Sequence, residues 1–128
     1  MSINFDFEVN GEVLTITAHG QDDSRDHMIE FADSILNLAK DHQVDKILCD
    51  ERDLIFNLST TDTFELAEYA SRSARMIDKI AVVVSKETLE QGAFYETVAS
   101  NRGLIIRVTD NYSEAVDWLQ YDVEHQVS

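Results

Sequence analysis

The sequence predicts a single α/β domain with a mixed, mostly parallel β-sheet that opens with an antiparallel hairpin. Two short apolar runs, residues 80–84 and 104–108, are rich in β-branched side chains and have the length of strands. Strands that are apolar on both faces are typical of a parallel sheet covered by helices. A helical segment, residues 86–101, separates the two runs, and another begins at Ser113, so strands and helices alternate here.

The N-terminal residues predict the hairpin. From Ile3 to Val9, apolar and polar residues alternate, as expected for a strand with one buried face. Asn10-Gly11 follows, a pair typical of two-residue turns in which both positions have positive φ. The segment from Val13 to Ala18 then returns as the second strand.

The central part of the chain predicts two helices around a short third strand. Residues 20–24 form a loop, and an amphipathic helix follows to about Lys40. Its apolar residues recur every three or four positions: Met28, Phe31, Ala32, Ile35, Leu38 and Ala39. Residues 46–50 are the third strand, and residues from about 61 to 75 the second helix, with Phe64 on its apolar face. The predicted order is β-β-α-β-α-β-α-β-α, and right-handed crossovers place the helices against the sheet.

Length and composition indicate one domain that needs no disulfide or structural metal ion to be stable. A chain of 128 residues buries roughly two-thirds of the surface that its unfolded form exposes. The single cysteine, Cys49, cannot form an internal disulfide. Neither a signal peptide nor an apolar run long enough to span a membrane is evident, so we expect a cytoplasmic protein. We expect the domain to occupy residues 1–120, and residues 121–128 to be a polar C-terminal tail.

The net charge of −15 excludes several classes of partner. It arises from 25 acidic and 10 basic residues, which are spread along the chain. Such a field repels nucleic-acid phosphates and anionic lipid head groups, so neither is an expected partner. The charge serves solubility or, as the alternative, forms a docking surface for a basic partner.

Four segments in a fixed order carry a resemblance to a known family. They are Gly11-Glu12-Val13, Lys46-Ile47-Leu48-Cys49-Asp50, Lys79-Ile80-Ala81-Val82-Val83 and Ser113-Glu114-Ala115-Val116-Asp117-Trp118-Leu119. Together they resemble the SpoIIAA-like family, whose members share the STAS fold of bacterial anti-sigma-factor antagonists. The resemblance covers nearly the whole chain. It implies a mixed sheet flanked by helices and a role in binding or regulation rather than catalysis. STAS-like domains also resemble the CRAL-TRIO lipid-binding fold.

The resemblance implies a phosphorylation site at the start of the second helix. In STAS antagonists an Asp-Ser-Ser-Gly motif opens this helix, and a serine in it accepts a phosphate. Residues 57–62 stand at the matching place, which makes Ser59 and Thr60 the phosphoacceptor candidates; Leu58 replaces the motif's aspartate and Thr61 its glycine. A phosphate there would meet free amides and the helix dipole. The alternative is that Ser59 simply caps the helix.

A second candidate site is an apolar stretch in the predicted loop after the third strand. Ligands of open α/β sheets bind beyond the carboxyl ends of the strands. The candidate residues for an apolar ligand or a partner are Cys49, Asp50, Leu54, Ile55, Phe56 and Leu58. The alternative is that they close over the core. We expect at least two of the last four to be covered by a second copy of the chain or to adjoin a ligand-sized apolar cavity.

Charged and metal-ligating residues give one further candidate. Arg72 and Arg75 are three positions apart on the predicted second helix and could bind an anionic group. Alternatively, they complement the C-terminal end of that helix. The four histidines lack zinc-ligand spacing, and the chain has neither a calcium loop nor a phosphate-binding glycine loop, so we expect no metal and no cofactor.

Two functional hypotheses follow. The first is a non-enzymatic STAS-like module that binds another protein or a second copy of itself. The second is a carrier or sensor of a small apolar, lipid-like molecule, bound near Leu54 to Phe56. An enzyme is not expected, because no titratable groups are placed for general acid–base work and no catalytic residue can be named.

Overall fold

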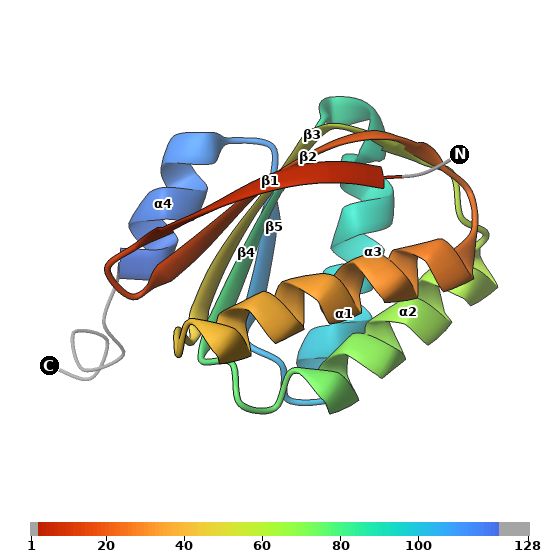
Figure 1. Ribbon diagram of the computed structural model, residues 1–128. Helices are drawn as coiled ribbons and strands as arrows, with labels where there is room; N and C mark the ends of the chain where they lie inside the picture. Colours follow the sequence, from red (N-terminus) through yellow and green to blue (C-terminus); the bar gives the residue numbers. More distant parts are fainter. Residues whose placement is uncertain (1–2, 121–128) are drawn as a thin grey trace, which may run out of the picture.

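The computed structural model describes residues 3–120, which form one five-stranded sheet with helices on both faces (Figure 1). The strands are β1 (Ile3–Asn10), β2 (Val13–Asp22), β3 (Lys46–Phe56), β4 (Lys79–Val84) and β5 (Ile106–Thr109). The helices are α1 (Arg25–Asp41), α2 (Thr60–Ser73), α3 (Leu89–Asn101) and α4 (Tyr112–Gln120), with a 3₁₀ turn, η1 (Lys86–Thr88), before α3. The predicted tail, residues 121–128, lies outside the described residues.

The strands lie in the sheet in the order in which they occur in the chain, so β1 and β5 are the edges. The pair β1–β2 is antiparallel, and the other three pairs are parallel. The predicted α/β class, the mixed sheet and the order β-β-α-β-α-β-α-β-α are confirmed. The last strand begins two residues later than predicted, at Ile106 and not at Leu104.

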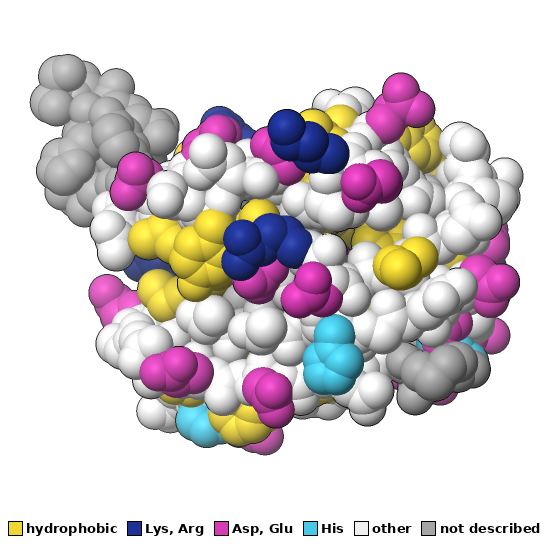
Figure 2. Space-filling model, turned by 90° about the horizontal axis from the view of Figure 1, so that it is seen from above, with side chains coloured by type: hydrophobic (Ala, Val, Ile, Leu, Met, Phe, Trp, Pro, Cys, Tyr) yellow, Lys and Arg dark blue, Asp and Glu magenta, His cyan; other side chains and the backbone are white. Residues whose placement is uncertain are grey.

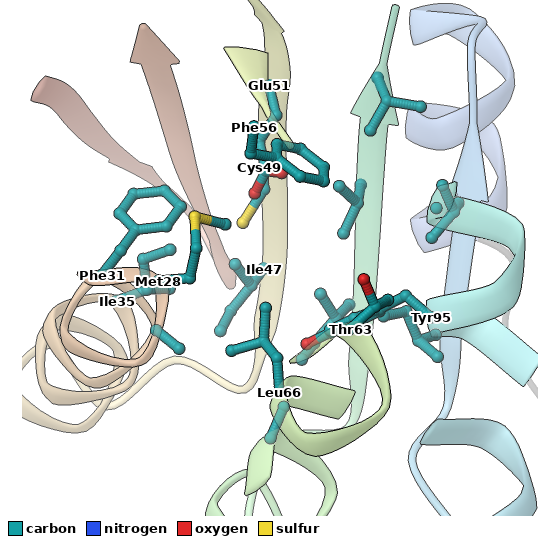
Figure 3. Close-up of a pocket in the computed structure, with 18 of the residues that line it drawn as sticks. Met28, Phe31, Ile35, Ile47, Cys49, Glu51, Phe56, Thr63, Leu66 and Tyr95 are labelled. Atoms are coloured by element: carbon teal, nitrogen blue, oxygen red, sulfur yellow. The ribbon is translucent and has the colours of Figure 1, made fainter. Parts of the chain in front are cut away.

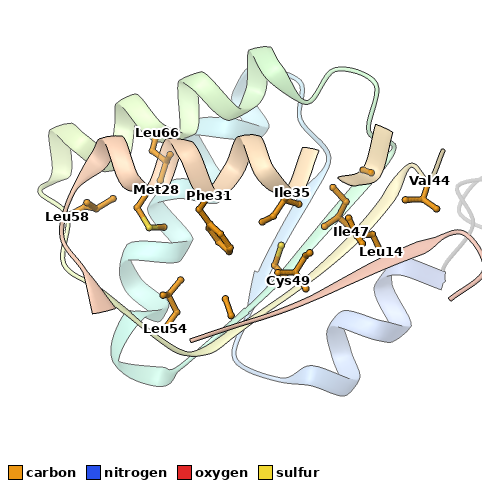
Figure 4. Packing of buried hydrophobic residues seen from close by; sticks show 13 residues of the cluster. Leu14, Met28, Phe31, Ile35, Val44, Ile47, Cys49, Leu54, Leu58 and Leu66 are labelled. Atoms are coloured by element: carbon orange, nitrogen blue, oxygen red, sulfur yellow. The ribbon is translucent and has the colours of Figure 1, made fainter. Parts of the chain in front are cut away.

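The core has a layer on each face of the sheet. On the larger side, α1, α2 and α3 cover the sheet, and residues such as Leu14, Ile47 and Phe31 pack together there (Figure 4). On the other side, Leu48 packs in a smaller cluster with Leu119 of α4. Ile47 and Leu48 thus lie on opposite faces of β3, as the alternation of side chains along a strand requires.

The hairpin turn lies one residue later than predicted. Asn10 pairs with Val13, so the two loop residues are Gly11 and Glu12. Gly11 has φ of 62°, whereas the one non-glycine residue with positive φ in the described chain is Gln43. The prediction that both turn positions have positive φ was therefore wrong. Glycine at the first loop position is the type II′ pattern, which also matches the twist of the strands.

The third strand is longer than predicted and contains a β-bulge. From the pair Thr17–Asp50 to the pair His19–Asp53, β2 advances by two residues and β3 by three. The extra residue shifts the alternation of side chains by one position. The strand then continues to Phe56, so the predicted loop at residues 53–56 was wrong. It also keeps residues 20–22 in β2, where we expected a loop.

Candidate functional site

A cavity of about 100 Å³ lies between the sheet and helices α1, α2 and α3 (Figure 3). Most of its lining is apolar; the side chains include Met28, Phe31, Ile47, Cys49, Phe56 and Leu66. Helices α2 and α3 contribute the small residues Ala70 and Gly92 to the lining. For scale, an engineered apolar cavity of about 150 Å³ binds benzene.

Glu51 brings a carboxyl group to this apolar cavity. It lies on β3 at the start of the bulge, after Asp50 and before pairing with β2 continues at Asp53. Its side chain shares a face of the strand with Ile47 and Cys49. As a residue, Glu51 is only 8% exposed. Within residues 3–120, neither a hydrogen bond nor an ion pair engages the carboxyl. Burial, together with the nearby charge of Asp50, raises the pKa of Glu51 to about 8, so the group is mostly protonated at neutral pH.

Two other polar side chains at the cavity, those of Thr63 and Gln91, have hydrogen-bond partners. The Thr63 hydroxyl donates to the Ser59 carbonyl at 2.9 Å. The Gln91 side-chain amide donates to the Leu58 carbonyl at 2.8 Å and to the Thr63 hydroxyl at 3.1 Å. Burial raises the pKa of the Cys49 thiol well above its usual value, so it is an unreactive thiol rather than a nucleophile. Glu51 lacks such partners within the described part of the chain, as does the Tyr95 hydroxyl, which also lines the cavity.

The structure separates the six residues predicted for an apolar groove. Cys49, Phe56 and Leu58 line the cavity. Leu54 is 1% exposed and lies in the core, whereas Ile55 is 58% exposed. This split follows from the bulge, after which Leu54 and Phe56 point toward the helices and Ile55 points away.

Asp50 lies on the opposite face of β3 from the cavity. Its carboxylate accepts hydrogen bonds from Arg52 Nε at 2.8 Å and Nη2 at 2.7 Å. These bonds hold the pKa of Asp50 below its usual range. Asp50 is therefore not a cavity residue, and the cavity carboxyl is Glu51, which the sequence reasoning did not select. The signal was present: Ile47, Cys49 and Glu51 stand two residues apart on one strand face.

Ser59 and Thr60 lie at the start of α2, as predicted. The Ser59 hydroxyl accepts a hydrogen bond from the Asp62 amide at 3.0 Å, so Ser59 is the N-cap residue. Both side chains are exposed. The structure thus contains the helix cap of the alternative interpretation, and Ser59 is exposed to solvent while it caps the helix.

Arg72 and Arg75 do not form a joint site on one helix. Arg72 lies in the last turn of α2 and pairs with Glu68 at 3.8 Å. Arg75 lies beyond the helix, because α2 ends at Ser73 and not at the predicted residue 75. The position of Arg72 agrees with the alternative that it complements the helix C-terminus.

The described residues contain neither a metal-binding cluster nor a helix able to span a membrane. Among residues 3–120, no group of three or more His, Cys, Asp or Glu side chains is arranged to hold a metal ion. In the same residues, every helix is too short or too polar to cross a membrane. On the face shown in Figure 2, acidic side chains are scattered between apolar and basic ones.

Comparison with solved structures identifies the fold. An anti-sigma factor antagonist from Mycobacterium paratuberculosis matches with a TM-score of 0.64 at 10% identity, covering 94% of this chain and 96% of that one. A Shewanella loihica PV-4 protein of the DUF3478 family, described as having a SpoIIAA-like fold, matches with a TM-score of 0.57 at 17% identity, covering 92% and 94%. The fold is SpoIIAA-like.

SpoIIAA itself is also structurally similar to this chain. The phosphorylated form of this Bacillus cell fate determinant matches with a TM-score of 0.51 at 18% identity, covering 91% of this chain and all of that one. No protein-family model and no curated protein sequence matches the chain. The resemblance that the sequence segments suggested is confirmed at the level of the fold.

Proposed function

We propose that the chain is a non-enzymatic regulatory module that acts by binding another protein. The observation that supports this function is its SpoIIAA-like fold, shared over more than nine-tenths of the chain with an anti-sigma factor antagonist and with SpoIIAA. An anti-sigma factor antagonist is named for its action on another protein. The net charge of −15 favours a partner whose contact surface is neutral or basic.

The partner surface that we propose surrounds the N-terminus of α2. Ser59 and Thr60 are exposed there, and Phe64, one turn further along, is 37% exposed. Thr60 and Phe64 are four residues apart and therefore lie on the same side of the helix. Aromatic side chains such as Phe64 are enriched in protein interfaces.

Ser59 is the residue that we propose as the regulatory phosphoacceptor. Its hydroxyl is exposed, and a structurally similar protein, Bacillus SpoIIAA, has a phosphorylated form. A phosphate would add a charge of about −1.5 to −2 at the helix N-terminus, close to Asp62 in the first turn. The added charge would change the surface offered to a partner without requiring a change of fold.

The test compares the same charge change at two helix starts. The wild type, Ser59→Asp and Ser113→Asp are used as bait, and the captured proteins are quantified by mass spectrometry. Ser113 is the matched control, because it is an exposed serine in the first turn of α4 on the other side of the sheet. A partner lost with Ser59→Asp and retained with Ser113→Asp supports the proposal. Equal capture of every protein by all three baits would contradict the proposal that the partner binds around the N-terminus of α2.

We propose a second function, the binding of a small apolar molecule, because a cavity lined mainly by apolar side chains lies beneath the helices. Native mass spectrometry of the purified protein tests both functions. A bound small mass supports the ligand, and a defined oligomer indicates that the protein partner is a second copy. A bare monomer leaves the protein-binding function to the capture experiment and counts against a tightly bound ligand.

A further inference from the structure

Glu51 is a buried carboxylic acid at the cavity, and no hydrogen bond or ion pair engages it within residues 3–120. A buried carboxyl without a hydrogen-bond partner costs free energy, and folded proteins satisfy most such groups. Here Glu51 is 92% buried as a residue, lines the apolar cavity and has no partner among the described residues, and its carboxyl oxygens keep some accessible surface. Glu51 and Arg52 are the two bulge residues opposite Ala18, and bulges are common next to functional sites.

We infer that the cavity binds a small uncharged molecule with one hydrogen-bond-accepting oxygen, such as a ketone or an ester, and that Glu51 is its polar anchor. This inference rests on the second proposed function, the binding of an apolar molecule. It adds the residue that recognises the ligand and the chemical class that the residue selects.

The electrostatics of the site favour a neutral ligand. Because the pKa of Glu51 is about 8, its protonated carboxyl can donate a hydrogen bond to a carbonyl oxygen at neutral pH. An anionic ligand would meet the charge of Asp50 and the net charge of −15. A cationic ligand would require an ion pair between apolar walls, where the cost of desolvation can exceed the attraction.

The size and shape of the cavity limit the ligand further. Its volume of about 100 Å³ is smaller than the roughly 150 Å³ that accommodates benzene. Phe56 and Met28 offer apolar surface on the side of the cavity near Glu51 and Cys49 (Figure 3). A short ketone such as butanone can therefore place its oxygen at Glu51 and its carbon atoms against these walls.

The experiment uses butanone and its hydrocarbon isostere 2-methyl-1-butene, titrated into the full chain and followed by methyl NMR. The variants are Glu51→Gln, which keeps a hydrogen-bond donor, and Glu51→Leu, which removes it. Glu90→Leu, at an exposed glutamate of α3, is the control. We expect Glu51→Leu to weaken butanone binding at least fivefold while the hydrocarbon binds as tightly as to the wild type or more tightly. Glu51→Gln and the control should keep both affinities.

A pH series gives a second measurement that does not depend on the folding of the leucine variant. The charge that acts on Glu51 is that of Asp50 on β3; the other titratable groups that interact with Glu51 are Cys49 on β3 and Tyr95 on α3, whose pKa values it raises. Butanone binding to the wild type should weaken as the pH rises through about 8, because the ionised carboxyl no longer donates. The Glu51→Gln variant should show no such loss.

The possible failures are distinguishable. If both probes bind and neither Glu51→Leu nor pH changes the preference between them, Glu51 is not the anchor, and the apolar-ligand function stands. If neither probe binds the wild type, both the inference and the apolar-ligand function are overturned, and the protein-binding function is unaffected.

Discussion

The substitution Glu51→Gln should remove a pH dependence from the stability of the protein. The folded pKa of Glu51 is about 8, against an ordinary value of 4.5. The folded state therefore binds the proton more tightly than the unfolded state, and its stability falls as the pH rises from about 4.5 to about 8. Linkage between these two pKa values gives a loss of about 3 kcal/mol from this group between about pH 5 and about pH 7.5.

The assay is urea unfolding followed by circular dichroism at constant ionic strength across this pH range. Other titrating groups contribute to both proteins, so the difference between Glu51→Gln and the wild type isolates Glu51. We expect this difference in free energy of unfolding to grow in favour of the variant by about 1.4 kcal/mol per pH unit near pH 6. A constant difference, with an unchanged urea dependence, would show that Glu51 titrates normally and is not a buried, unpartnered acid.

Three further predictions concern stability and are checked by thermal and urea unfolding. Gly11→Val should cost about 1–3 kcal/mol, because the φ of 62° strains a β-branched residue although space is free around the position; an unchanged melting temperature would contradict this. Gly92→Ala should cost about 1–3 kcal/mol, because the new Cβ would lie 2.7 Å from Val108 Cγ1; adding Val108→Ala should recover part of the loss, and no recovery would refute the contact. Ser59→Ala should cost about 1 kcal/mol and Ser59→Asp much less, because only aspartate can still accept from the Asp62 amide; equal losses would show that the cap contributes little.

Much of the fold could be predicted because local patterns determine it. The run at residues 80–84 is apolar and β-branched, and the structure places it as a central strand with parallel neighbours on both sides. The spacing of Met28, Phe31 and Ile35 predicted the helix face that α1 buries. In these elements, side-chain periodicity and tertiary packing agree, so the sequence alone was sufficient.

The candidate site was harder to predict because it depends on pairing between distant segments. The residues from Asp50 to Asp53 are all charged and look like a solvated loop. Pairing of residues 19–22 with residues 53–56 of β3 instead extends the strand, and the bulge brings Leu54 and Phe56 to the same face as Glu51. No local pattern predicts an extra residue whose position is set by the register with another strand. The cavity likewise depends on how α1, α2 and α3 pack against the sheet.

The two edges of the sheet have different protection against self-association. An edge strand offers unpaired backbone groups to any second chain, and charged side chains discourage such pairing. β1 carries exposed Asp6 and Glu8, so antiparallel pairing of two β1 strands would bring like charges together. On the short edge strand β5, the Val108 amide donates to Glu96 Oε1 at 2.6 Å, which occupies a group that a second chain would need. A continuous intermolecular sheet is therefore disfavoured at both edges, and this protein should resist fibril formation even at high concentration.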